Sequence, residues 1–113
     1  MEQLSFSALL PRRFPDLNPH IEEQFVAFHT HHPEVFDLFK TFASDVRTRG
    51  FAHYSSKALM ERIRWYTEIE TGQTDFKINN NFSSGYARLL IQIDPSFSNF
   101  FALRHTPGTV EIH

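Results

Sequence analysis

The chain has 113 residues, 41% apolar and 21% charged, with a formal net charge of −2, which fits one globular domain and excludes a disordered or collagen-like chain. It contains no cysteine, so disulfides, thiol catalysis and cysteine-based zinc sites are excluded, and no apolar run reaches the ~18 residues of a membrane span. We therefore expect a cytoplasmic protein, a single domain over 1–113 with an N-terminal arm at 1–17 and a C-terminal tail at 105–113. Its 13 Phe, 3 Tyr and 1 Trp predict either an aromatic core or an exposed apolar surface.

The N-terminal arm contains two prolines and no long periodic run. We expect Leu4–Leu10 to be a short helical or extended segment, followed by a loop. Its apolar residues are expected to anchor the arm to the body of the domain: Leu4, Phe6, Leu9, Leu10 and Phe14.

Two consecutive helices are predicted next. Asn18 can cap a helix and Pro19 is preorganised for its first position, so a helix should span about 19–30. Pro33 begins the second helix, over about 33–49, because proline also disfavours the α conformation of the residue before it. Gly50 can end this helix in the left-handed conformation.

A third helix is predicted over about 56–70, capped by Ser55 and ended by Gly72. Its apolar stripe is Leu59, Ile63, Tyr66 and Ile69. Trp65 lies one residue off this stripe. It either widens the core face or is partly exposed as an interface anchor.

The remaining elements are short. Phe76–Asn79 alternates apolar and polar residues and could be a strand. A fourth helix, capped by Ser83 or Asn81, is expected over about 84–93, a last short helix over about 95–103, and an edge strand or a frayed tail at Thr109–Ile112. The predicted fold is therefore mainly α: a single small domain of four to five helices with at most one short β element.

Three histidines, His29, His31 and His32, invite a metal-binding interpretation. His29 and His32 have i, i+3 spacing, but Pro33 pulls His32 out of the helix and no carboxylate partner is fixed. We expect structural or solvated roles, with metal binding as the alternative. No catalytic or phosphate-loop motif is present, so we predict a non-enzymatic protein with no cofactor.

Charge is distributed unevenly along the chain. Residues 14–45 contain six acidic residues and one lysine, whereas residues 46–64 contain five basic residues and one acidic residue. One interpretation is a pair of solvated helix faces of opposite sign that attract each other. The other is a basic surface for an acidic partner.

Segment 76–88 places Asn, Ser, Tyr and Arg side chains around a helix N-terminus. Asn can bond adenine, Arg can bond guanine and Ser can bond phosphate. The alternative is an Asn-rich turn that satisfies its own backbone, with Arg88 bonding a carbonyl or an acid. For a nucleic-acid surface, the candidate phosphate contacts are Arg47, Arg49, Lys57, Arg62, Arg64 and Lys77, and the residues nearest the bases are Asn80, Asn81, Ser84 and Arg88.

Several short motifs are spread along the chain: Phe28-His29 with Pro33, Gly50 with Tyr54-Ser55, Arg64-Trp65, Lys77-x-Asn79-Asn80, Tyr86-Ala87-Arg88-Leu89, Pro95, Phe100-Phe101 and Arg104. Together they resemble a group of short phage- and prophage-encoded proteins for which no activity is established. The resemblance covers roughly Asn18–Arg104 and implies a bacterial or phage cytosolic protein, without carrying over any catalytic residue.

Two functions follow as hypotheses. The first is a small phage-type DNA-binding module, supported by the basic stretch and segment 76–88. The second is a protein-binding phage factor that inhibits or redirects a host protein, for example an anti-defence protein. A homodimer is compatible with both, because the excess Phe could form a two-fold apolar interface.

Overall fold

The computed structural model describes residues 13–72 and 77–103, and the mainly α prediction is confirmed for this part of the chain, which contains no strand. Within the predicted strand, Lys77–Asn79 is irregular, and Phe76 lies outside the described residues, as do Leu4–Leu10 and Thr109–Ile112. The elements are α2 (Pro19–His31), α3 (Pro33–Thr48), α4 (Ser56–Trp65), the π-helix η1 (Tyr66–Glu70), the 3-10 turn η2 (Asn80–Phe82), α5 (Ser83–Ile93) and the 3-10 turn η3 (Pro95–Phe97).

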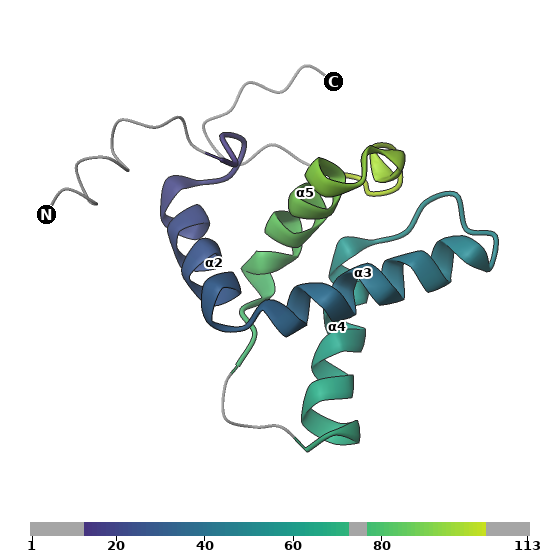
Figure 1. Ribbon diagram of the computed structural model, residues 1–113, viewed down its shortest axis with the longest axis horizontal. Coiled ribbons are helices and arrows are strands. Elements are labelled where there is room, and N and C mark those ends of the chain that lie inside the picture. Colours follow the sequence, from purple (N-terminus) through teal and green to yellow (C-terminus); the bar gives the residue numbers. More distant parts are fainter. Residues whose placement is uncertain (1–12, 73–76, 104–113) are drawn as a thin grey trace, which may run out of the picture.

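The first two helices begin and end as their sequence signals predict. Asn18 Oδ1 accepts hydrogen bonds from the backbone N–H groups of His20, at 2.8 Å, and Ile21, at 3.4 Å. Pro33 interrupts the helix after α2, and α3 then runs across the molecule, with α5 above it and α4 descending below it in Figure 1. After α3, Gly50 has a φ of 103°, the left-handed conformation expected at a helix end.

The third helix changes type along its length. Ser55 Oγ caps α4 by accepting from the Ala58 N–H at 3.1 Å. After Trp65 the chain continues as the π-helix η1, closed by the Thr71 N–H donating to the Tyr66 carbonyl at 2.9 Å. The predicted helical span of about 56–70 is therefore confirmed as two consecutive helices.

The predicted apolar stripe is wrong at Ile69, whose side chain is 59% exposed. A π-helix has more residues per turn than an α-helix, so each residue rotates less about the axis. Three residues after Tyr66, Ile69 has not rotated back to the buried side. Thr67 is buried in this turn instead.

Two predictions near α5 are also corrected. The cap is neither Ser83 nor Asn81: Asn79 Oδ1 accepts from the Asn81 N–H at 2.8 Å, which starts the preceding turn η2. The last predicted helix, over about 95–103, is only the 3-10 turn η3, followed by a turn through residue 100. The apolar residues of this segment are nevertheless buried: Phe97, Phe100 and Phe101.

Aromatic rings fill the core, with Tyr86 of α5 at its centre. Tyr86 is fully buried and its ring contacts Phe25 edge-on at a centroid distance of 4.7 Å and stacks on Phe39 at 5.6 Å. Gly85 lets α5 approach α2 closely, since a Cβ at this position would lie 2.9 Å from the Phe25 ring. The Phe excess is therefore largely explained by the core.

The Phe residues predicted outside helices have different environments. Phe14 and Phe82 are buried and Phe51 is exposed, while Phe6 and Phe76 lie outside the described residues. Phe14 therefore anchors the segment before α2, as the sequence predicts. Over residues 13–72 and 77–103, the helices are too short or too polar to cross a membrane.

Candidate functional site

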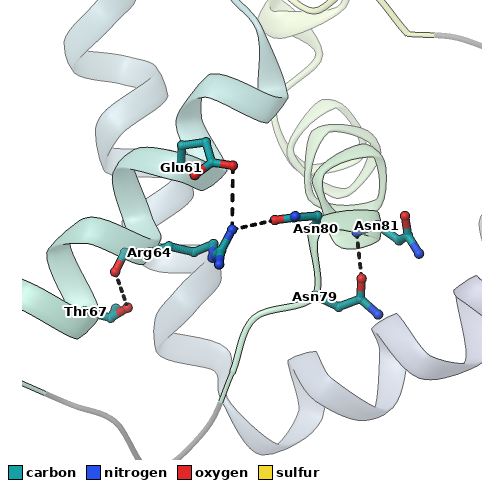
Figure 2. Close-up of polar contacts among 6 residues, drawn as sticks. All are labelled: Glu61, Arg64, Thr67, Asn79, Asn80 and Asn81. Atoms are coloured by element: carbon teal, nitrogen blue, oxygen red, sulfur yellow. Dashed lines mark hydrogen bonds and ion pairs between the residues drawn. The ribbon is translucent and has the colours of Figure 1, made fainter.

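One pair of residues joins the two halves of the predicted nucleic-acid surface. Figure 2 shows Arg64 of α4 and Asn80 of η2 pointing toward each other, and Arg64 Nη1 donates to Asn80 Oδ1 at 2.8 Å. The same Nη1 lies 3.6 Å from Glu61 Oε2 one helical turn earlier. The basic stretch and the Asn-rich turn therefore meet, but at a guanidinium already paired with an amide and a carboxylate.

Two of the predicted phosphate contacts lie at the far end of α3. The Arg47 guanidinium lies 3.7 Å from the centroid of the Phe97 ring, and its Nη1 donates to Ser96 Oγ at 2.8 Å. Arg49 Nε forms an ion pair with Asp45 Oδ2 at 3.2 Å. Arg47 thus connects α3 to η3, and Arg49, the residue that follows α3, pairs with a carboxylate of that helix.

Arg88 and Ser84 bond each other on α5. Arg88 Nη1 donates to the hydroxyl and the carbonyl oxygen of Ser84. Burial lowers the pKa of the Arg88 guanidinium, and the nearby Asp16 carboxylate opposes this effect. This arginine faces the segment before α2, which agrees with the alternative in which Arg88 bonds a carbonyl or an acid.

The other candidates are exposed or partly engaged. The Arg62 guanidinium lies 4.7 Å from the centroid of the Phe42 ring of α3. Asn81 donates its backbone N–H to Asn79. Lys57 and Lys77 are exposed. The ten predicted residues therefore do not form one continuous basic face: Arg64 and Asn80 are brought together, whereas Arg47, Arg49 and Arg88 each have other partners.

The most unusual surface is at the junction of α4 and η1. Trp65 is 58% exposed and Ile69, one turn later, is 59% exposed. We call these two residues the Trp65–Ile69 patch. In Figure 1 the end of η1 lies at the bottom of the view, below α3. The interpretation of Trp65 that the sequence favours, a residue that widens the core face, is wrong, and the exposure expected of the alternative, a partly exposed anchor, is confirmed.

Charged residues of both signs flank this patch. Glu61 and Arg62 precede Trp65 by four and three residues, and on an α-helix these spacings place side chains beside one another. Glu68 lies in η1, next to Ile69 in the chain. Sequence reasoning missed Ile69 as a surface residue because the π-helix gives no recognised sequence signal.

The three histidines have separate environments. The His29 ring stacks on Phe25 within the aromatic core, and burial lowers its pKa. His31 Nδ1–H donates to the Ala27 carbonyl at 2.8 Å, whereas His32 Nδ1 lies 3.5 Å from Glu34 Oε2. Among the described residues, no group of three or more His, Asp or Glu side chains is arranged to hold a metal ion.

Comparisons with known proteins identify no relative of this chain. No model of a protein family, no curated protein and no solved structure matches this chain.

Proposed function

We propose that this chain is a small, non-enzymatic protein-binding module that contacts its partner through the Trp65–Ile69 patch. The observation that carries the proposal is the exposure of Trp65 and Ile69, at 58% and 59%, in a protein whose other large aromatic residues are mostly buried. Tryptophan is enriched among the residues that contribute most to binding at protein interfaces. A π-helix, which is also frequent at functional sites, holds Ile69 on the surface.

The charges around the patch favour a protein partner over nucleic acid. A DNA-binding surface attracts phosphates with an excess of positive charge. Here Arg62 is accompanied by Glu61 and Glu68, and the segment from Ser56 to Glu70 has three basic and three acidic residues. An apolar centre with a polar rim of both signs is the usual anatomy of a protein interface.

The resemblance to phage- and prophage-encoded proteins suggests the class of partner. A small phage protein without catalytic residues would act by occupying a surface of a host protein, which it inhibits or redirects. A bacterial host protein is therefore the partner that this proposal names.

Affinity capture with matched variants tests the proposal. The wild-type protein, Trp65→Ala and Ile93→Ala are each immobilised and incubated with nuclease-treated bacterial lysate. Ile93 is the control because it is also an exposed apolar residue, 53% exposed, on a different element. We expect one host protein to be retained by the wild type and by Ile93→Ala and lost with Trp65→Ala.

Binding must then be reproduced with the purified host protein. The single tryptophan serves as the reporter, because its emission shifts to shorter wavelength when a partner covers it. Retention of the same host protein by Trp65→Ala would overturn the proposal, and so would capture by the wild type only from lysate that was not treated with nuclease.

Nucleic-acid binding is the second candidate, and the contact between Arg64 and Asn80 favours it. This contact brings two predicted recognition residues to the N-terminal end of α5, beside exposed Asn81. If they bind DNA, the logarithm of affinity should fall by about 0.9 per neutralised phosphate for each log unit of salt. Arg64→Gln should reduce this slope, and Arg49→Gln should not. An affinity that does not respond to salt would exclude this candidate.

A further inference from the structure

A second candidate site lies between the segment before α2 and helix α5. Here the described residues that line a cavity of about 300 Å³ carry four kinds of groups: guanidiniums, a carboxylate, a side-chain amide and apolar side chains. The residues that carry the argument are Arg13, Phe14, Arg88, Ile91, Gln92 and Leu103. Ligand pockets begin at about this size, and a cavity of roughly 150 Å³ already holds benzene.

Arg13 is held in place by Gln92. The Gln92 side-chain amide donates to the Arg13 carbonyl at 3.0 Å, and Arg13 Nε donates back to Gln92 Oε1 at 3.3 Å. The guanidinium carbon also lies 5.4 Å from the centroid of the Phe14 ring. These contacts use only the inner N–H of the guanidinium. Its two outer nitrogens donate to no other residue in the described part of the chain, so they are available to an anion.

Basic side chains outnumber acidic ones among the described residues that line the cavity. Arg88 lines it with Arg13, and Asp16 is the acidic residue among them. Asp16 stabilises the charged form of Arg88. Arg13 is therefore the group that the cavity offers to an anion.

The walls are apolar. Phe14 is buried, and Ile91 and Leu103 are half-buried and pack against the core. An inorganic anion would accept hydrogen bonds from Arg13 but leave the apolar walls exposed to water. A neutral apolar molecule would cover the walls but give the guanidinium no partner.

From this arrangement we propose that the cavity binds a small amphipathic anion, with a carboxylate or a similar group on Arg13 and an apolar body of one or two rings against Phe14, Ile91 and Leu103. Gln92 is the positioning residue that orients Arg13. This site is separate from the Trp65–Ile69 patch and does not depend on the proposed protein-binding function.

Two probes with the same ring system distinguish the contribution of the charge to binding from that of the apolar body. 2-Naphthoate carries the carboxylate, and 2-naphthalenemethanol is its neutral counterpart. Each is titrated into the full chain while NMR follows the backbone amides of α5 and the side-chain amide of Gln92. We expect 2-naphthoate to shift the Gln92 signals and to bind about tenfold or more tightly than the alcohol, because hydrogen bonds to charged groups contribute more than neutral ones.

The variants identify the anion's partner. Arg13→Gln, at an exposed position, should weaken 2-naphthoate about tenfold or more and leave the alcohol unchanged. Arg49→Gln is the matched control, since it removes an exposed arginine that follows α3 and is paired with Asp45. Trp65→Ala excludes binding at the Trp65–Ile69 patch, and both controls should bind 2-naphthoate as the wild type does. Equal affinity for the two probes, unchanged affinity in Arg13→Gln, or no Gln92 shift would overturn the proposal.

Discussion

Aromatic side chains lie in two different environments in this protein, in the core around Tyr86 and at the Trp65–Ile69 patch. In the core, rings from α2, α3 and α5 contact one another, and Tyr86 has no exposed surface. At the patch, Trp65 lies among charged side chains and more than half of it is exposed. The number of aromatic residues therefore does not show which are available for binding, whereas their position relative to the helix faces does.

The largest expected effect comes from the core. Phe25 is almost fully buried and its ring contacts Phe14, Phe82 and Tyr86. Phe25→Ala leaves a cavity that these rings cannot fill, so we expect the free energy of unfolding to fall by about 3–5 kcal/mol. Urea unfolding followed by far-UV circular dichroism measures this loss. A loss below about 1 kcal/mol would mean that the core is not packed as described.

Gly85→Ala tests how closely α5 approaches α2. Alanine is a better helix former than glycine by about 1 kcal/mol. However, the new Cβ would lie 2.9 Å from Cγ and Cδ2 of Phe25, and this buried ring cannot move aside without displacing its neighbours. Overpacking costs about 1–3 kcal/mol, so we expect net destabilisation in the same urea experiment. Net stabilisation would contradict the close packing of α5 on α2.

Tyr86→Phe should stabilise the protein, in contrast to the two previous substitutions. The Tyr86 hydroxyl is buried, and no hydrogen-bond partner for it exists among the described residues. Leaving such a group without a partner costs about 1–3 kcal/mol, so its removal should raise the free energy of unfolding by about 1 kcal/mol. A decrease would show that the hydroxyl forms a hydrogen bond in solution. The acceptor would then be Nδ1 of His29, which is also buried and without a partner in the described part of the chain and whose ring contacts that of Tyr86.

A pH dependence at His29 is expected to be smaller. Burial, and secondarily the positive charge of Arg13, lowers the pKa of this ring below 6.5, and Asp37 partly opposes the effect. The unfolded chain then binds more protons than the folded one between the two pKa values. Stability should therefore be complete above pH 6.5 and decline below it, less so in His29→Gln. An equal decline in both would assign it to other groups.

The sequence predicts the helices better than the surface they present. Asn18, Pro33 and Ser55 act locally, through caps and fixed backbone angles, so the starts of α2, α3 and α4 are predictable within a residue. The same reasoning fails after Asp94, where the cap and Pro95 start only a 3-10 turn. Whether such a turn grows into a helix depends on the tertiary contacts of the residues that follow it, which local signals do not encode.

The site was harder to predict because most side-chain partners lie in distant segments. The sequence suggested phosphate contacts for Arg47 and Arg64 and a base contact for Arg88. In the structure, Arg47 contacts Ser96 and Phe97, and Arg64 contacts Asn80. Only the tertiary fold decides which distant segment lies beside these two arginines, whereas Arg88 bonds Ser84 one turn earlier on its own helix.

The smallest effect on stability is expected at the patch itself. Trp65→Ala removes a large side chain that is 58% exposed, so the free energy of unfolding should change by no more than about 0.5 kcal/mol. Comparing the stability of this variant with that of Phe25→Ala contrasts two truncated aromatic side chains that differ mainly in burial. A loss as large as that in Phe25→Ala would place Trp65 in a packed environment in solution.

The fluorescence of the single tryptophan completes this comparison without a mutation. An exposed indole should emit at long wavelength and be quenched readily by acrylamide. Short-wavelength emission with protection from acrylamide would mean that something covers the patch in the pure protein. Dilution then distinguishes the causes, because protection by a second copy of the chain is lost as the concentration falls, whereas burial within one chain is not. A concentration-independent, exposed Trp65 is the result that leaves the patch open to a host protein.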